Sequence, residues 1–382
     1  MILSNQVRTS PDNTIFIIAG EESGDIHGAK LVQEINKLNP SIQFIGHGGN
    51  KMKAAGVEII EHISNLSFVG LTEVLKHLPY IRRVRNKTIR KIQAIRPARI
   101  ILIDYPGFNL NLAKKIQHLK IPITYFILPQ VWAWKENRTF KIKKFTDQAL
   151  SIVPFEKEWF NAHGLEIDFV GHPFVEIKKP QINKDGFFSK HSLTLKKPLL
   201  TLLPGSRQQE IDRHWPIFQA VINKLHDVFP DLQFIVGKAP DVEISDCPQF
   251  VHIENNNVRL AMAYGDAGII ASGTATLEAA VLGLPSIVCY KTSGITYWVG
   301  KQLAKVEYLS LVNLIAKHKI VPEFIQHDMT PDALIKAIIP LLSNTPERNK
   351  MIEYYEQIKT KLGNPGVYAR TAKLIVDNTT LD

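Results

Sequence analysis

The chain has 382 residues, of which 45% are hydrophobic and 21% charged, and it carries a net charge of +10 and only two cysteines. This length exceeds that of a usual single domain, and the composition is that of a soluble globular protein that can bury substantial cores. Cys247 and Cys289 offer neither a disulfide framework nor a metal cluster, and they fit a reducing cytosol.

Apolar, β-branched runs alternate with helical patterns in both halves of the sequence. In the first half we predict strands at residues 14–19, 43–46, 99–104, 121–128 and 148–152. In the second half we predict strands at residues 199–203, 232–236, 250–253, 267–271 and 286–290. Continuous apolar strands separated by helices indicate parallel sheets that are covered on both faces. The sequence therefore predicts an α/β protein with two Rossmann-like domains.

The boundary between the domains is predicted near Gly171, His172 and Pro173, because a glycine and a proline are followed by a polar stretch over residues 178–190. We assign residues 1–172 to the first domain and 173–364 to the second. Residues 365–382 form a terminal helix pattern, and such a helix can cross back to the first domain.

A turn of small and acidic residues follows the first predicted strand. Residues 19–25 contain Glu21, Ser23, Gly24 and Asp25, and we expect a helix to begin near Ile26. Ligands of open α/β sheets bind outside the carboxyl ends of strands, so this turn lies on the functional edge. It is a candidate for binding sugar hydroxyls. The simpler alternative is a strand–helix turn capped by Ser23 or Asp25.

A single acid, Asp104, ends the predicted strand over residues 99–104 and precedes a turn-rich segment. A carboxylate in this position can accept a proton from a substrate hydroxyl if its surroundings are partly desolvated. An aspartate at a strand end also serves as a helix cap or turn residue, and the segment alone does not decide between these roles.

The segment after the first strand of the second domain contains Gly205, Ser206 and Arg207. Glycine permits close backbone approach, serine supplies a hydroxyl, and arginine can hold a phosphate through two hydrogen bonds. These residues are candidates for a diphosphate site, and a surface ion pair of Arg207 is the alternative.

A second loop of small residues, Ser272, Gly273 and Thr274, runs into a predicted helix that carries Glu278 one turn later. The free amides and positive dipole of a helix N-terminus favour phosphate. A carboxylate at position 278 can accept hydrogen bonds from both ribose hydroxyls, so the arrangement indicates a sugar nucleotide. A capped core helix with an exposed glutamate is the alternative.

Residues 68–91 combine apolar positions at helical spacing with a cationic face. From Lys76 to Lys91 the chain has seven lysines and arginines and no acid, and Pro79 argues against one unbroken helix. Residues 1–180 hold 25 Lys and Arg against 16 Asp and Glu, whereas the remainder holds 21 against 20. This pattern predicts contact with anionic lipid, and a helix packed on its own core is the alternative. The candidate membrane contacts are Phe68, Val69, Leu71, Leu75, Leu78, Arg82, Arg83 and Arg85.

A second basic run follows Trp132 and Trp134 and contains Lys135, Arg138, Lys141, Lys143 and Lys144. Basic residues beside tryptophans also fit RNA, but no recognised RNA-binding signature occurs, so we expect no nucleic-acid partner. The histidines show no zinc-ligand pairing, and we expect no metal and no cofactor. His172 fits a hinge better than a catalyst.

The motifs together resemble the lipid A disaccharide synthase family. AGEESGD, IDYPGFN, QVWAW, PFEKEWF, FVGHP, LPGSR, ASGTATLE and SLVNLIA occur in the family's order between about residues 14 and 320. The resemblance implies a GT-B fold with the active site in the cleft between the two domains. It also implies a peripheral enzyme on the cytoplasmic face of the inner membrane of Gram-negative bacteria, with no catalytic metal.

The family resemblance implies an inverting transfer of 2,3-diacylglucosamine from UDP-2,3-diacylglucosamine to 2,3-diacylglucosamine 1-phosphate (lipid X). Asp104 would be the general base. The donor site would comprise Gly205, Ser206, Arg207, Ser272, Gly273, Thr274, Glu278 and Asn313. The acceptor or sugar side would comprise Glu21, Ser23, Gly24, Asp25 and Gln130.

The sequence departs from the family pattern at Gly107, where the family motif carries a second acid. A secondary substrate contact is therefore missing, whereas Asp104 is retained. The alternatives are another GT-B enzyme, such as a UDP-N-acetylglucosamine 2-epimerase or the transferase that forms lipid II, or a non-catalytic UDP-sugar- or lipid-binding GT-B protein. The sequence leaves open the oligomeric state and the preferred acyl-chain length.

Overall fold

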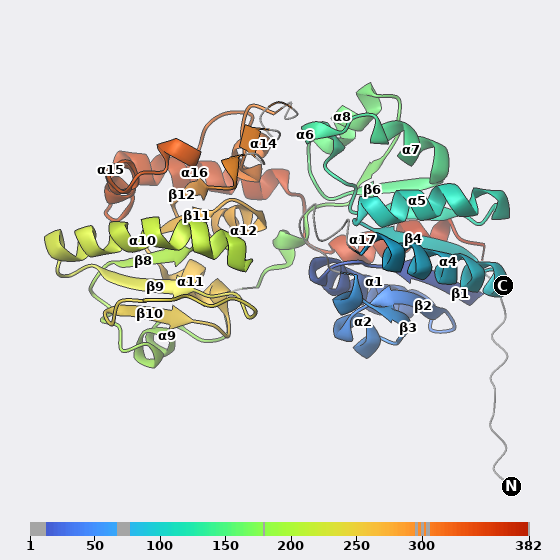
Figure 1. Ribbon diagram of the computed structural model, residues 1–382, viewed down its shortest axis with the longest axis horizontal. Coiled ribbons are helices and arrows are strands. Elements are labelled where there is room, and N and C mark those ends of the chain that lie inside the picture. The colour runs from blue at the N-terminus through green and yellow to red at the C-terminus, as the bar shows by residue number, and fades with distance from the viewer. Residues whose placement is uncertain are drawn as a thin grey trace, which may run out of the picture. The chain divides into compact units, whose positions relative to one another are not determined.

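A computed structural model describes residues 13–66, 77–178, 180–294, 297–298, 302 and 306–380. The described residues form two compact units (Figure 1). Unit 1 comprises residues 1–176 and 363–382, and unit 2 comprises residues 177–362. The chain thus leaves unit 1 after Glu176, four residues beyond the predicted boundary at His172.

Unit 1 is built on a seven-stranded parallel sheet with the order β3-β2-β1-β4-β5-β6-β7. Its strands are β1 (Thr14–Ile18), β2 (Gln43–Gly48), β3 (Val57–His62), β4 (Arg99–Ile103), β5 (Ile123–Phe126), β6 (Gln148–Ser151) and β7 (Asp168–Phe169). β1 and β4 are buried along their whole length, because helices cover both faces of the sheet. The continuous apolar runs of these strands are the pattern expected for such burial.

Helices α1 (Glu22–Leu38), α2 (Asn50–Ala54) and α17 (Val367–Asp377) pack together in unit 1. Helices α4 (Leu78–Ile95), α5 (Pro106–Ile116) and α7 (Arg138–Phe145) form a second group. α4 begins one residue before Pro79, whose missing N–H is tolerated in a first helical turn. The main core of the unit lies between this second group and the sheet.

The C-terminal helix α17 belongs to unit 1, as the predicted fold class allowed, and it lies beside α1 (Figure 1). Glu176 accepts hydrogen bonds from the backbone N–H groups of Gly366 and Val367, each at 2.7 Å. The carboxylate therefore caps α17 and joins the segment that leaves the unit to the segment that returns. His172 lies buried beside this junction, where its Nδ1 accepts from the N–H of Phe174 at 3.1 Å.

Unit 2 contains a six-stranded parallel sheet with the order β10-β9-β8-β11-β12-β13. Its strands are β8 (Leu199–Leu203), β9 (Gln233–Gly237), β10 (Val251–Glu254), β11 (Ala267–Ala271), β12 (Ser286–Tyr290) and β13 (Glu323–Ile325). Helices α10 (Gln208–Val228) and α15 (Pro331–Ile338) pack together. The other group consists of α11 (Val258–Tyr264), α12 (Thr274–Leu282), α14 (Leu311–Ala316) and α16 (Pro346–Lys361).

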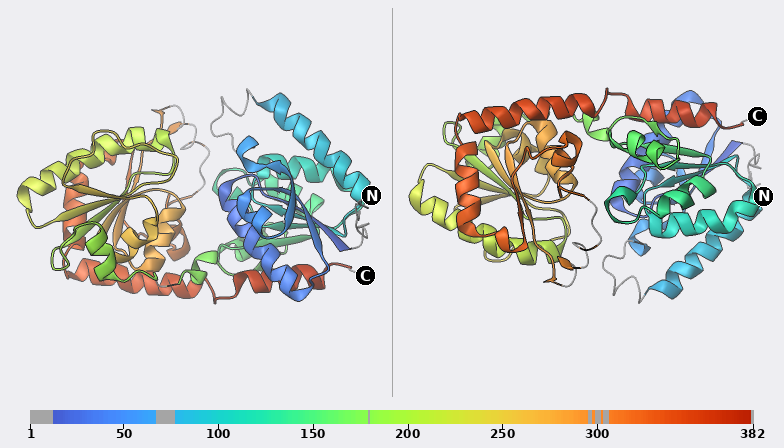
Figure 2. Two further views of the ribbon diagram at one scale, coloured as in Figure 1. Left: turned by 90° about the horizontal axis from the view of Figure 1, so that it is seen from below. Right: turned by 90° about the horizontal axis from the view of Figure 1, so that it is seen from above.

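The prediction of two Rossmann-like domains with parallel sheets is confirmed, and Figure 2 shows helices on both faces of each sheet. β8, β11 and β12 have the predicted bounds. Three strands were not predicted: β3, β7 and β13. They lie at the edges of the sheets and are exposed or only partly buried for most of their length, so they lack the continuous apolar run on which the prediction depends.

Candidate functional site

Asp104 follows β4 directly and lies at the carboxyl edge of the unit 1 sheet. Its backbone N–H donates to the carbonyl of Phe126 at 3.2 Å. Its carbonyl accepts from the Tyr125 hydroxyl at 2.6 Å and from the Asn109 amide at 2.7 Å. Asp104 and Tyr105 adopt φ values of +42° and +48°, in the left-handed region that non-glycine residues rarely enter. The neighbouring strand β5 and Asn109 on α5 thus hold the backbone that turns this carboxylate out of the sheet.

The electrostatic surroundings of Asp104 suit proton transfer near neutral pH. Burial, and after it the negative charge of Glu21, raise the pKa of the Asp104 carboxyl to about 6, whereas a hydrogen bond from the backbone of Tyr105 opposes the rise. A base with this pKa is ionised at pH 7 and is more basic than an ordinary aspartate. Asp104 is therefore the strongest candidate for a general base in unit 1.

Glu21 and Ser23 are exposed at the same edge, after β1. Glu21 is the extended residue before α1, and the helix begins at Glu22 rather than near Ile26 as predicted. Glu22 and Asp25 in the first turn explain the early start, because carboxylates there interact favourably with the helix dipole. Gly20 permits the Tyr105 ring to lie on the turn, since an added Cβ would come within 2.2 Å of that ring.

Gly24 and Asp25, predicted on the sugar side, instead face the interior. Asp25 is only 2% exposed, and its carboxylate accepts N–H groups of Gly49, Lys51 and Met52 at 2.6–3.0 Å. A Cβ on Gly24 would lie 3.1 Å from that of Ala19. Asp25 therefore stabilises the start of α2, and Gly24 lets α1 approach the sheet; neither offers a free group to a ligand.

The turn after β5 holds Gln130 exposed, just before α6 (Val131–Trp134). Behind it, the indole N–H of buried Trp132 donates to Glu156 at 2.9 Å, and the other oxygen of Glu156 accepts from the Ser151 hydroxyl. Burial raises the pKa of the fully buried Glu156 to about 7. This cluster was not predicted from the sequence, because only the fold brings Trp132 beside Glu156, which lies 24 positions further along the chain.

In unit 2, Ser272, Gly273 and Thr274 form an open turn after β11. All three are exposed or partly exposed, and no side chain caps the start of α12. Its first turn contains no acid, so the positive end of the helix dipole is not neutralised there. A Cβ on Gly273 would meet nothing within 4 Å, which leaves room for a ligand. This turn can accept a phosphate.

Gly205, Ser206 and Arg207 lie at the same edge, after the neighbouring strand β8. Here a carboxylate of the protein occupies the turn: Glu210 accepts the N–H of Ser206 at 2.8 Å and lies 3.4 Å from Arg207. Gly205 has φ +142°, and a Cβ there would come within 2.5 Å of Glu210. Arg207 is half exposed and stays available to an anionic ligand.

His214, which the sequence analysis did not assign, connects two loops of this edge. The buried ring hydrogen-bonds the carbonyl of Pro204 at 2.7 Å through Nδ1 and accepts the N–H of Lys291 at 2.9 Å through Nε2. Burial lowers the pKa of His214. The neutral ring with its proton on Nδ1 fits both contacts, so His214 holds the loops after β8 and β12 together.

Glu278 and Asn313 differ in whether they can reach a ligand. Glu278 lies on α12, is 15% exposed in its side chain and pairs with Arg259 through one oxygen. Asn313 is fully buried: its amide donates to the Val321 carbonyl and to Glu323, and its oxygen accepts from Ile320 and Val321, all at 2.7–2.9 Å. Asn313 was predicted to complete the donor site, but its hydrogen bonds connect α14 to β13 instead.

The basic segment is described only in part, because Phe68, Val69, Leu71 and Leu75 lie outside the described residues. α4 buries Val84, Thr88 and Ile92 against the unit, so this face of the helix belongs to the core. Leu78 and Arg85 are partly buried, whereas Arg82 and Arg83 are exposed.

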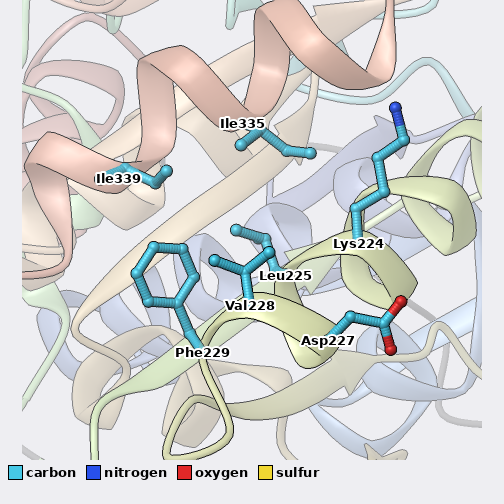
Figure 3. Close-up of a pocket in the computed structure, with 7 residues that line it drawn as sticks. All are labelled: Lys224, Leu225, Asp227, Val228, Phe229, Ile335 and Ile339. Atoms are coloured by element: carbon cyan, nitrogen blue, oxygen red, sulfur yellow. The ribbon is translucent and has the colours of Figure 1, made fainter.

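A separate apolar hollow of about 370 Å³ lies between the end of α10 and α15 (Figure 3). It is lined by Lys224, Leu225, Asp227, Val228, Phe229, Ile335 and Ile339. The end of α10 leads back to the start of β9, so the hollow lies at the amino edge of the sheet, away from the turns described above. It is not part of the candidate site.

Within the described ranges, no group of three or more histidine, cysteine, aspartate or glutamate side chains could hold a metal ion. Across the same ranges, no helix has both the length and the apolar character needed to cross a bilayer.

Comparison with protein families gives a match over nearly the whole chain. The family model described as lipid-A-disaccharide synthetase matches residues 15–375. A lipid-A-disaccharide synthase of Nitrosococcus oceani is 36% identical over 369 residues, covering 95% of each chain. The synthase of Geobacter sulfurreducens is 35% identical over 370 residues, covering 95% of this chain and 96% of the relative.

Solved structures share the fold. The UDP-GlcNAc 2-epimerase of Neisseria meningitidis, bound to UDP-GlcNAc, has a TM-score of 0.61 at 12% identity, covering 95% of this chain and 98% of that one. The glycotransferase of kitacinnamycin has a TM-score of 0.64 at 13% identity, covering 96% and 98%. These likenesses identify the fold as GT-B.

Proposed function

Because the chain belongs to the lipid-A-disaccharide synthetase family, we propose that it transfers 2,3-diacylglucosamine from its UDP derivative to 2,3-diacylglucosamine 1-phosphate. The products are the β-1,6-linked disaccharide 1-phosphate and UDP. The observation that carries the proposal is the Asp104 carboxyl, turned out of the sheet on a strained backbone with its pKa raised to about 6.

Asp104 is the general base of the proposed reaction. The 6-hydroxyl oxygen of the acceptor attacks C1 of the donor sugar while the bond from C1 to the β-phosphate oxygen breaks. The hydroxyl proton passes to Asp104, and the electron pair of the broken bond leaves with UDP. One displacement inverts the configuration at C1, and it requires one base on the face opposite the leaving group.

Unit 2 binds the donor nucleotide in this proposal. The amides and hydroxyls of Ser272, Gly273 and Thr274 hold the diphosphate at the open end of α12. Arg207 adds a positive charge that stabilises the leaving group. Glu278 accepts hydrogen bonds from the ribose, using the oxygen that does not pair with Arg259.

The lipid substrates imply contact with a membrane, and we place the protein at the cytoplasmic face of the inner membrane. The exposed guanidinium groups of Arg82 and Arg83 support this, because anionic headgroups attract such cations. The wild-type protein should sediment with anionic vesicles at low salt and less at high salt. Failure to sediment at low salt would contradict this location.

No observation favours the epimerase alternative. The likeness to a UDP-GlcNAc 2-epimerase is 12% in sequence and concerns the fold.

The test is a transfer assay in mixed micelles that contain UDP-2,3-diacylglucosamine and lipid X. Wild type should release UDP and form the disaccharide 1-phosphate, and Asp104→Asn should lose roughly 10²–10⁴-fold in rate. If wild type binds UDP and makes no disaccharide, the acceptor assignment is wrong. If Asp104→Asn keeps its rate, another group is the base.

The same substitution supplies its own folding control. The folded pKa of Asp104 lies above the ordinary value of 3.8, so ionisation above pH 6 opposes folding and protonation relieves the cost. At pH 8 the free energy of unfolding of Asp104→Asn should therefore exceed that of wild type, by at most about 3 kcal/mol, and the variant should unfold at a higher temperature. The advantage should shrink as the pH falls from 6 towards 4. A variant that is inactive and also less stable at pH 8 would indicate a structural role.

A further inference from the structure

Two aromatic side chains are exposed on unit 1 near the edge that carries Asp104. Trp134 at the end of α6 is 48% exposed, and Phe140 on α7 is 67% exposed. Among the described residues of unit 1, Leu38 is the only other large apolar side chain that is exposed to this degree. Exposed aromatic rings that are close in the chain require an explanation more than scattered single ones do.

Both rings have cations beside them. Lys135 Nζ lies 4.1 Å from the centre of the Trp134 ring, and the Arg138 guanidinium carbon lies 5.8 Å from it. Lys144 Nζ lies 5.8 Å from the centre of the Phe140 ring. Lys141 is exposed on the same helix, and Glu136 is the single acid between residues 131 and 145. The surface is therefore strongly cationic as well as aromatic.

This aromatic-basic surface is held rigidly. Trp132, two residues before Trp134, is buried, donates to Glu156 at 2.9 Å and packs edge-on against Phe155 at 4.9 Å. Ile142 is fully buried under α7. α6 comes shortly after β5, the strand beside β4, so Trp134 lies near the edge at which Asp104 stands.

We propose that the aromatic-basic surface, formed by Trp134, Lys135, Arg138, Phe140, Lys141 and Lys144, binds the interface of an anionic lipid bilayer. Trp134 and Phe140 enter at the level of the headgroups, and the cations contact lipid phosphates. Lysine stems can lie along the rings while their ammonium groups stay in water. This surface lies outside residues 68–91. Its binding to lipid does not depend on the proposed function, whereas its value to catalysis rests on that function.

Charge and ring geometry favour lipid over nucleic acid. Single-stranded RNA would need an open ring face for base stacking. Lys135 lies over a face of Trp134 at 4.1 Å, and Arg138 is also close to this ring. A bilayer interface needs no open ring face, because it accepts the ring together with its neighbouring cations.

The experiment is sedimentation of the full chain with vesicles of phosphatidylcholine, with and without phosphatidylglycerol, in the absence of sugar substrates. Trp134→Ser/Phe140→Ser should lower the partition coefficient for anionic vesicles at least about tenfold. Lys141→Gln/Lys144→Gln should lower it roughly fivefold for each lysine. The matched controls are Leu38→Ser and Lys114→Gln/Lys115→Gln. They change exposed residues near the C-terminal ends of α1 and α5, and these variants should bind to vesicles like wild type.

A second measurement tests how deeply Trp134 enters the bilayer. Brominated lipids should quench the tryptophan fluorescence of bound wild type, and Trp134→Phe should bind almost as well with much less quenching. Wild-type binding by the double serine variant, or quenching that survives in Trp134→Phe, overturns the proposal. Tight binding of an oligoribonucleotide without binding to vesicles overturns it in favour of RNA. The micelle assay keeps the two proposals separable: lipid binding through Trp134 without transferase activity refutes only the function.

Discussion

Backbone strain and raised basicity coincide at Asp104. Asp104 and Tyr105 both adopt left-handed backbone conformations, which cost free energy for residues other than glycine. The contacts from Tyr125 and Asn109 to the Asp104 carbonyl hold this conformation in place. The strain therefore lies where the carboxylate leaves the strand, as is typical of functional sites.

The pH dependence of the reaction should report this carboxylate. Asp104 must be ionised to accept a proton, so kcat/KM should fall about tenfold per pH unit below pH 6. Glu21→Gln should move the midpoint to lower pH, because the charge of Glu21 contributes to the raised pKa. Glu22→Gln, which removes the neighbouring charge that pairs with Lys51 at 3.0 Å, is the control. An unchanged midpoint in Glu21→Gln would show that burial alone sets it.

Residue roles could be predicted from the sequence only in part. The sequence pattern, a single acid after an apolar run, correctly predicted that Asp104 lies at the end of a buried strand. Asp25 and Asn313 looked equally suited to a ligand, but Asp25 serves backbone amides 24 to 27 positions away. Tyr105 and Glu156 lie in motifs that match the family, but no role could be assigned to them or to His214 from the sequence, because their contacts depend on which segments the fold brings beside them.

The two candidate phosphate loops of unit 2 differ because of the helices that follow them, α12 and α10. The first turn of α12 has no acid and no side-chain cap, whereas Glu210 already occupies the first turn of α10. Both loops were predicted as phosphate sites, because the sequence shows their glycine and hydroxyl residues. It does not show that the Glu210 side chain folds back to accept the N–H of Ser206.

The long buried strands were predicted well for the opposite reason, because their apolar pattern is local in the sequence.

Alanine substitutions at two glycines near Asp104 test the packing of the turns around it. Gly107 is exposed in the first turn of α5, and an added Cβ would meet nothing within 4 Å. Gly107→Ala should raise the free energy of unfolding by roughly 0.5–1 kcal/mol. Gly20→Ala should lower it by about 1–3 kcal/mol or more, because the new Cβ would lie 2.2 Å from the Tyr105 ring. Chemical denaturation measures both, and equal effects of the two would contradict the packing described here.

At the scale of the whole molecule, unit 1 depends on residues from both ends of the sequence. The buried guanidinium of Arg99, at the start of β4, donates to the Thr379 hydroxyl at 2.6 Å and to the carbonyl of Asn378. The Gln148 amide donates to the carbonyl of Leu374 at 3.0 Å. Two strands therefore use the end of α17 as a hydrogen-bond partner.

Ending the chain at Leu362 should destabilise unit 1 selectively. The truncation exposes the face of α1 that packs on α17 and removes Asn378 and Thr379, the partners of the Arg99 guanidinium just after α17, which is costly for a buried charge. Hydrogen exchange should show loss of protection in β1, β4 and α1 but not in β8 and β11. A chain ending after residue 380 is the control, because it keeps α17 and Thr379. Full protection in the shorter chain would show that α17 is dispensable.

The late position of α17 has a consequence for synthesis on the ribosome. Unit 1 emerges first but stays incomplete while all of unit 2 is translated, since its last helix comes from residues 363–382. Throughout that interval an apolar face of α1 is open to chaperones and proteases, and a stalled ribosome would release a chain that cannot finish its first half. A gene rearranged to begin at residue 177 would place residues 363–382 directly before residues 1–176. Each half would then be encoded in one piece, and the order of translation would no longer delay unit 1.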